Sequence, residues 1–302
     1  HVRSRRQRQM CIRDRYLFNY HYFQKQYEND IVKNNDEEKT KQLKKLVTPF
    51  ILRRNKKEVL TELPDKIEQN IILPFNDEEE KLYVANLAKA NKELQELYDI
   101  EGSDKMQILK LLTRLRQLCL EPRLVYDNID QPSSKLKACM ELIKTMQENK
   151  QKVLLFSSFT SVLDLIAEEC QKAGITYYML TGSTNKEDRR ELVSRFQKDD
   201  TTVFLISLKA GGTGLNLTSA EAVIHFDPWW NVSAQNQATD RAYRIGQKNN
   251  VQVFNLVMKD SVEEKIIELQ KRKKELADMF VENNSGGLSQ MSKEDILSLF
   301  TM

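Results

Sequence analysis

The strongest constraint on the fold is the alternation of short apolar runs with amphipathic stretches in the second half of the chain. The apolar runs cover residues 153–157, 176–180, 202–207, 222–226 and 251–257. Amphipathic stretches of helical length lie among them, at 160–173, 185–198 and about 232–244. Strands that alternate with helices of this length form βαβ units, in which the strands lie parallel and helices cover both faces. The sequence therefore predicts an α/β fold.

The residues before this region predict helices. Asn76 followed by four acidic residues indicates an N-cap and a first helical turn, which opens a helix toward Tyr98. A second helix is predicted from about Lys105 to Leu118 by its apolar stripe. Beyond the sheet, a capping box at residues 261–264 predicts a charged helix to about residue 280.

Composition excludes several classes of protein. No apolar run approaches the roughly 18 residues that a membrane span needs, and the basic N-terminus is not followed by the apolar stretch of a secretory signal. The four cysteines form no C-x-x-C pair and there are three histidines, so no metal site is predicted. Of the 47 basic and 44 acidic residues, six and one lie in residues 1–15, which leaves a net charge of −2 elsewhere. A strong basic field for nucleic acid is not predicted.

Two polar segments follow predicted strands, where ligands of parallel sheets bind. Residues 207–217 hold three glycines in four positions, so bare backbone N–H groups can approach an anion; a plain strand-to-helix turn explains them equally well. If residues 233–244 are a helix, Gln237, Arg241 and Arg244 share one face and form a donor array for a polyphosphate. Alternatively, Arg244 simply pairs with Asp240. Neither segment is a dinucleotide fingerprint or a Walker A loop.

Taken together, these motifs resemble the second RecA-like lobe of the Swi/Snf family of helicase-like ATPases. In chain order they are LLFSSFTSVLDLI, YYMLTGST, FLISLKAGGTGLNLTSAEAVIHFDPWWN and QATDRAYRIGQ. The resemblance covers about residues 40–280 and implies a RecA-like parallel sheet flanked by helices, preceded by a mostly helical segment. It divides the chain into a foreign leader (1–15), the end of a first lobe and linker (16–70), a helical insertion or linker (71–132), the C-terminal lobe (133–280) and a tail with a short helix (281–302).

The resemblance also implies roles at a nucleotide. Arg241 and Arg244 match the two arginines that reach across the cleft between lobes to the ATP γ-phosphate, where they stabilise charge on the transferring phosphoryl group. Gln237 matches the glutamine that sets this segment against the nucleotide. Gly212 and Gly214 match the loop that couples nucleotide to DNA.

A second set of residues matches positions near the DNA backbone, namely Ser158, Thr160, Lys209 and Thr213. Hydroxyl and ammonium groups suit phosphates and give no base readout, as expected of a motor that moves along any sequence. Trp229 and Trp230 are interpreted as a structural wedge between lobes in preference to base-stacking groups.

The departure from the family is the lack of first-lobe motifs. Neither a Walker A loop nor an acidic Walker B strand is present, since Pro74 and Asn76 interrupt the apolar run before residues 77–80. ATP and Mg²⁺ are the implied cofactors, with their main ligands expected in a missing first lobe. The chain is thus interpreted as the C-terminal part of a longer motor, inactive alone. Its arginine-rich leader is interpreted as an artefact in preference to a basic arm that binds nucleic acid.

The function implied is ATP-dependent translocation on double-stranded DNA without strand separation. A nucleoprotein or RNA polymerase is the implied object of the motor, no membrane is involved, and the composition favours the bacterial cytosol or nucleoid. The alternative is a separate, non-catalytic module that binds nucleic acid or protein. The near-neutral charge of residues 16–302 argues against tight DNA binding by such a module.

Overall fold

The computed structural model describes residues 20–28, 30–31, 36–47, 49, 64–98, 105–211 and 215–279. They fall into two compact units, the first with residues 20–49 and 275–279 and the second with residues 64–274. The predicted leader and tail, and the glycine-loop residues 212–214, lie outside the described residues.

The first unit is helical in its described part. Its elements are α2 (Tyr20–Phe23), the π-helix η2 (Gln24–Glu28) and α4 (Glu37–Val47). Asp36 caps α4, because its Oδ1 accepts hydrogen bonds from the backbone N–H groups of Glu38 (2.9 Å) and Lys39 (3.0 Å). This agrees with the mostly helical segment predicted ahead of the sheet.

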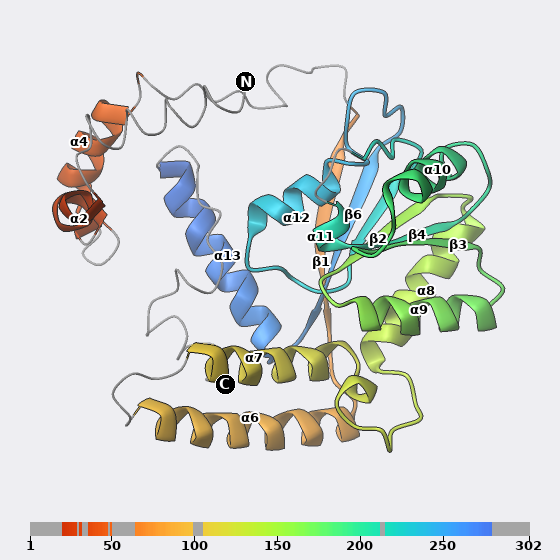
Figure 1. Cartoon of the computed structure of the whole chain (residues 1–302), viewed down its shortest axis with the longest axis horizontal. Coiled ribbons are helices and arrows are strands. Elements are labelled where there is room, and N and C mark those ends of the chain that lie inside the picture. The colour runs from red at the N-terminus through yellow and green to blue at the C-terminus, as the bar shows by residue number, and fades with distance from the viewer. Residues whose placement is uncertain are drawn as a thin grey trace. The chain divides into compact units, whose positions relative to one another are not determined.

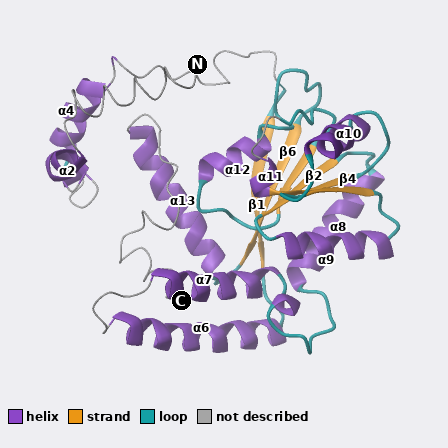
Figure 2. Cartoon of the chain, viewed as in Figure 1, coloured by secondary structure: helices purple, strands orange, loops and turns teal. Residues whose placement is uncertain are grey.

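The second unit is built on one six-stranded sheet in which every neighbouring pair is parallel (Figures 1 and 2). The strand order is β1-β6-β5-β2-β4-β3. The strands are β1 (Lys66–Leu73), β2 (Val153–Ser157), β3 (Tyr177–Leu180), β4 (Val203–Ser207), β5 (Ala222–His225) and β6 (Val251–Met258). The predicted α/β class, with a parallel sheet flanked by helices, is confirmed.

Helices connect and cover the strands. They are α6 (Asp77–Tyr98), α7 (Lys105–Leu120), the 3-10 turn η4 (Pro122–Leu124), α8 (Ser134–Glu148), α9 (Thr160–Lys172), α10 (Lys186–Phe196), α11 (Leu208–Gly211), α12 (Val232–Thr239) and α13 (Val262–Met279). The predicted helices at 160–173 and 185–198 are confirmed within two residues of their bounds. The helix predicted over 232–244 is shorter, since α12 ends at Thr239.

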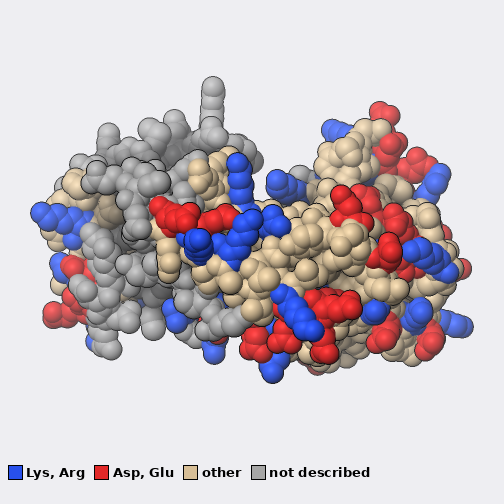
Figure 3. Space-filling view, turned by 90° about the horizontal axis from the view of Figure 1, so that it is seen from below, with Lys and Arg blue, Asp and Glu red and all other residues tan. Residues whose placement is uncertain are grey.

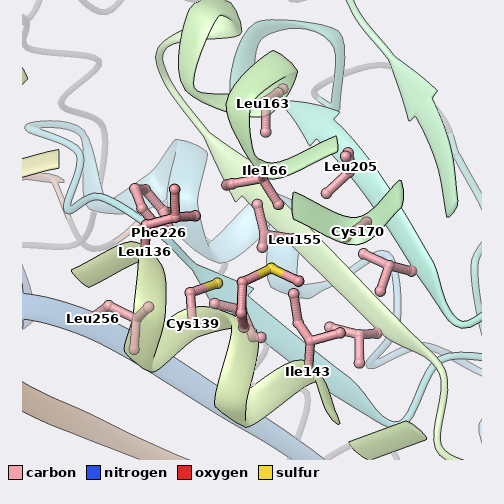
Figure 4. Packing of buried hydrophobic residues seen from close by; sticks show 14 of the residues in the cluster. Leu136, Cys139, Ile143, Leu155, Leu163, Ile166, Cys170, Leu205, Phe226 and Leu256 are labelled. Carbon is pink, nitrogen blue, oxygen red and sulfur yellow. The ribbon is translucent and has the colours of Figure 1, made fainter. Parts of the chain in front are cut away.

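The alternation of side chains along the strands produces two apolar cores, one on each face of the sheet. Leu155 of β2 packs with α8 and α9 on one face, whereas Leu154 and Phe156 pack with α10 and the α11–α12 region on the other. Figure 4 shows the first core, with Leu136, Cys139 and Ile143 of α8 and Leu163 and Ile166 of α9 gathered over Leu155 and Leu205. Burial of such side chains contributes about 1.5–3 kcal/mol each.

The acidic run 77–80 begins a helix, as predicted. Asn76 Oδ1 accepts from the N–H groups of Glu78 (3.0 Å) and Glu79 (2.9 Å), and Glu79 Oε2 accepts from the N–H of Asn76 (3.1 Å). These reciprocal bonds form a capping box. Glu79 Oε1 also accepts from the N–H of Ser134 (2.7 Å), which ties the start of α6 to the start of α8.

Strand β1 is the element that the sequence does not predict. It pairs in parallel with β6 from Lys66 opposite Val251 to Leu73 opposite Met258. Four of its first five residues are polar and most of the strand is exposed, so its pattern lacks the apolar run of a central strand. The boundary predicted between residues 70 and 71 falls inside this strand.

Candidate functional site

The residues predicted near DNA lie where strands β2 and β4 end. Ser158 follows β2 directly, and Thr160 is the first residue of α9 and is exposed. Lys209 lies in the short helix α11 after β4 and is exposed. Because parallel strands end at one edge, β2 and β4 bring these residues to the same edge of the sheet. The fourth predicted residue, Thr213, lies outside the described residues.

Asp227, which follows β5, organises this edge. Its buried carboxylate accepts from Ser157 Oγ (2.7 Å), the backbone N–H of Ser158 (2.9 Å), Ser158 Oγ and Arg116 Nη2 (2.8 Å). We call Asp227, Ser157, Ser158 and Arg116 the Asp227 cluster. It joins the ends of two neighbouring strands, β2 and β5, to helix α7.

Arg116 is the member of the cluster that comes from outside the sheet. Its Nη2 donates to Ser158 Oγ (3.0 Å) and to the carbonyl of Pro228 (3.4 Å) as well as to Asp227. Its guanidinium carbon lies 4.9 Å from the ring centre of Phe159, 5.4 Å from that of Trp229 and 5.5 Å from that of Trp230. Arg116 is not among the site residues predicted from the sequence. An arginine between leucines on the apolar stripe of a helix could have indicated a buried, paired cation.

The two tryptophans follow the cluster in sequence. Trp230 is buried with α6, α7 and α13 in a third apolar core, and Trp229 packs against the same core while half-buried. Their indoles contact Arg116 within the second unit. The prediction of a structural role, as opposed to base stacking, agrees with this packing, whereas a wedge between lobes stays a prediction.

The predicted shared helical face of Gln237, Arg241 and Arg244 is wrong. Gln237 lies on α12 and is exposed, but the helix ends at Thr239 and both arginines follow it, in the turn at residues 240–246 (the arginine loop). After Thr239 the chain continues in tight turns, in which the N–H of Arg241 donates to the carbonyl of Ala238 (3.1 Å), and the carbonyl of Arg241 accepts from the N–H of Leu217 (3.0 Å). Gly246, at φ +102°, then adopts a conformation that other residues rarely reach.

The arginine loop is held firmly at its base. Gln247 is buried, and its Nε2 donates to the carbonyls of Ala220 (2.8 Å) and Ala242 (3.3 Å). Ala242 and Tyr243 are buried in the core of the α10–α12 face. Arg241 and Arg244, on either side of this buried pair in the sequence, are half-buried and exposed.

The charge of the loop matches a polyanion. Burial and the neighbouring positive charge of Arg244 lower the pKa of Arg241, and Asp240 opposes this shift. Two guanidinium groups close enough to influence each other are suited to a triphosphate such as that of ATP. Among the described ranges, no group of three or more acidic, histidine or cysteine side chains could hold a metal ion. None of the helices described is long and apolar enough to cross a membrane.

His225, at the end of β5, lies beneath α12. Its Nε2 is 2.9 Å from Thr239 Oγ1, and its ring stacks on Phe156 with centroids 5.7 Å apart. Burial lowers the pKa of His225 to about 4, against the opposing charges of Glu68 and Asp227. A neutral imidazole is therefore part of the folded structure at neutral pH.

This pKa predicts a loss of stability in acid. The imidazole of the unfolded chain binds a proton near pH 6.5, whereas the folded one does not. The free energy of unfolding is therefore highest above pH 6.5 and falls, by about 3 kcal/mol in total, as the pH drops toward 4. Urea denaturation of the wild type and of His225→Gln between pH 7.5 and 4.5 measures this pH dependence of the unfolding free energy. The difference in unfolding free energy between the two proteins should shrink with falling pH, and a difference independent of pH would contradict the assignment.

Comparisons with known proteins agree with this architecture. A family described as SNF2-related domain matches residues 11–124, and one described as helicase conserved C-terminal domain matches residues 134–246. A Mycoplasma pneumoniae protein named as an uncharacterized ATP-dependent helicase is 37% identical over 277 residues, which are 91% of this chain and 26% of that protein. The chain spans about a quarter of the length of this curated relative.

Solved structures extend the comparison. The Sulfolobus solfataricus SWI2/SNF2 ATPase core in complex with double-stranded DNA is 31% identical with a TM-score of 0.64, covering 94% of this chain and 61% of that one. The C-terminal domain of a SWI2/SNF2 ATPase from the same organism is 27% identical with a TM-score of 0.63, covering 78% of this chain and 98% of that domain. Together with the parallel sheet and the ordered motifs along its edge, these matches show that the chain belongs to the Swi/Snf family of helicase-like ATPases.

Proposed function

We propose that this chain supplies the second lobe of an ATP-dependent translocase that moves along double-stranded DNA. The arginine loop carries the proposal, since it presents two neighbouring guanidinium groups on a backbone fixed by Gln247 and by the N–H of Leu217. ATP would bind between this lobe and a first lobe that provides the main phosphate and Mg²⁺ ligands.

The contribution of the chain to catalysis is electrostatic. When the lobes close, Arg241 and Arg244 would contact the γ-phosphate and stabilise the charge that spreads over its oxygens as it transfers to water. A loop fixed before the reaction needs little reorganisation at the transition state. Gln237, exposed on α12 ahead of the loop, would contact the nucleotide from the same side.

The contribution to DNA binding is made at the edge where β2 and β4 end. Ser158, Thr160, Lys209 and Thr213 would contact the phosphate backbone, and Gly212 and Gly214 would couple the nucleotide to DNA. On the face seen in Figure 3, acidic and basic side chains are interspersed, so that face offers no extended field of one sign. Because residues 16–302 carry a net charge of −2, affinity for DNA is expected to come from both lobes acting together.

The whole protein is proposed to act on DNA-bound objects, a nucleoprotein or RNA polymerase, in the cytosol or nucleoid of a bacterium. The Sulfolobus structure with double-stranded DNA and the bacterial relative support this proposal.

DNA-stimulated turnover tests the proposal. With the full-length protein, linear duplex DNA should raise the rate of ATP hydrolysis, and ATP should drive release of the third strand from a DNA triplex while a plain duplex stays paired. ATP-independent triplex release, or hydrolysis that no DNA stimulates, would contradict the translocase. The control is the same triplex reaction with a non-hydrolysable ATP analogue in place of ATP, which reports the effect of binding alone.

A further inference from the structure

The hydroxyl of Ser158 is already engaged, which bears on its proposed contact with DNA. A serine hydroxyl has one proton to donate, and Ser158 Oγ donates it to Asp227 Oδ2 while accepting from Arg116 Nη2 (3.0 Å). A phosphate oxygen only accepts hydrogen bonds. For Ser158 to bind a DNA phosphate, its proton must turn away from Asp227.

Asp227 cannot lose that donor without consequence. Its side chain is 1% exposed, so a missing hydrogen bond cannot be replaced by bulk water. Its remaining donors are Ser157 Oγ, the N–H of Ser158 and Arg116 Nη2. The carboxylate must then depend more strongly on Arg116, the only cation in the cluster.

Asp227 is also close in sequence to the elements of the arginine loop. Asn231, four residues later, is the N-cap of α12, and the arginine loop follows that helix directly. Between them, the N–H of Trp229 donates to Gln235 Oε1 on α12 (3.3 Å). A shift of Asp227 would therefore act at the start of α12, the helix that the arginine loop directly follows.

The bonding of Arg116 is unusual for a cation with a purely structural role. All three of its hydrogen bonds to the cluster and to Pro228 come from Nη2, and its buried Nε has no hydrogen-bond partner in the described part of the chain. Three aromatic rings set the plane of the guanidinium instead. Through Nη2 alone, Arg116 thus contacts two strand ends at once, that of β2 at Ser158 and that of β5 at Asp227.

We propose that Arg116 and Asp227 are positioning residues that couple the DNA contact of Ser158 to α12 and the arginine loop. A DNA phosphate and Asp227 compete for the hydroxyl proton of Ser158. When the phosphate accepts that proton, the ion pair with Arg116 keeps Asp227 in place. The inference rests on the proposed function, because it assumes that Ser158 meets DNA and that Arg241 meets ATP.

The test compares variants of the full-length protein. The readouts are the ratio of the ATP turnover rate with saturating duplex DNA to that without DNA, and the KM for ATP. Arg116→Lys keeps the charge but loses the planar fork, and should lower the ratio on the order of 10-fold with the KM for ATP within about twofold. Arg114→Lys is the matched control: Arg114 lies on the same helix and over an aromatic ring, Tyr126, but contacts Asn86 instead of the cluster, and its ratio should stay within about twofold.

A double-mutant cycle separates coupling from general damage. Ser158→Ala should also lower the ratio, and adding Arg116→Lys to it should lower the ratio little further, since both changes break one pathway. If Arg116→Lys does not fold, Ser158→Ala, which removes a single oxygen atom, tests the same pathway. An unchanged ratio in Arg116→Lys, or effects that multiply in the double variant, would overturn the inference. If duplex DNA does not stimulate the wild type, the proposed function itself fails.

Discussion

Arg241→Ala is expected to lower the turnover rate of ATP hydrolysis about 10³-fold in the full-length protein, with ATP binding largely retained. The reason is that an arginine finger acts mainly on charge that develops in the transition state, while the main ligands of bound ATP are expected in the first lobe. Single-turnover hydrolysis and equilibrium binding of a fluorescent ATP analogue measure the two quantities separately.

The control for this change is another arginine of the same lobe. Arg195 on α10 pairs with Glu191, and both side chains are more than half exposed, at 59% and 57%. Arg195→Ala should leave the turnover rate within about twofold, since exposed ion pairs contribute little. Hydrolysis at the wild-type rate in Arg241→Ala would remove the arginine loop from the proposed mechanism.

Lys135→Met is expected to destabilise the second unit by about 3–5 kcal/mol. Lys135 Nζ lies 2.7 Å from both carboxylate oxygens of Glu263, and the two side chains are 0% and 1% exposed. The pair joins the first turn of α8 to the first turn of α13. Removing the lysine leaves the carboxylate buried without a counter-charge, which is the costly case for buried ion pairs.

Urea denaturation followed by tryptophan fluorescence measures this loss. The double variant Lys135→Met/Glu263→Gln should recover much of the stability, because the amide is neutral and still accepts from the N–H of Met258. Lys172→Met, which breaks a surface pair with Glu169, should change the unfolding free energy by less than about 1 kcal/mol. Equal losses of unfolding free energy in Lys135→Met and Lys172→Met would contradict the prediction that the buried pair contributes more to stability than the surface pair.

Much of the fold could be predicted from the sequence because its central strands are buried on both faces. Strands β2 and β4 are fully buried, so their sequences are continuous apolar runs that stand out from the amphipathic helices. The start of α6 was predictable for a different reason, since Asn76 and Glu79 form a capping box within four residues. Both signals are local.

The features that could not be predicted depend on contacts distant in sequence. Strand β1 is polar at four of its first five positions and is a strand because of its ladder with β6, about 185 residues away. The position of the arginine loop depends on the N–H of Leu217, which donates from a distant segment to the carbonyl of Arg241. The Asp227 cluster joins Arg116 to a carboxylate 111 residues later. In each case the partner, and hence the local structure, cannot be read from the neighbouring residues.

The central claim is tested most directly by comparing the rate of ATP hydrolysis of this chain alone with that of the full-length protein. The claim is that the described lobe holds the arginines of an ATP site whose main phosphate and metal ligands lie in another lobe. The 302-residue chain, shown to be folded by cooperative thermal unfolding, should hydrolyse no ATP with duplex DNA and Mg²⁺, whereas the full-length protein should turn over ATP under the same conditions. Hydrolysis by the chain alone at a rate comparable to that of the full-length protein would contradict the account.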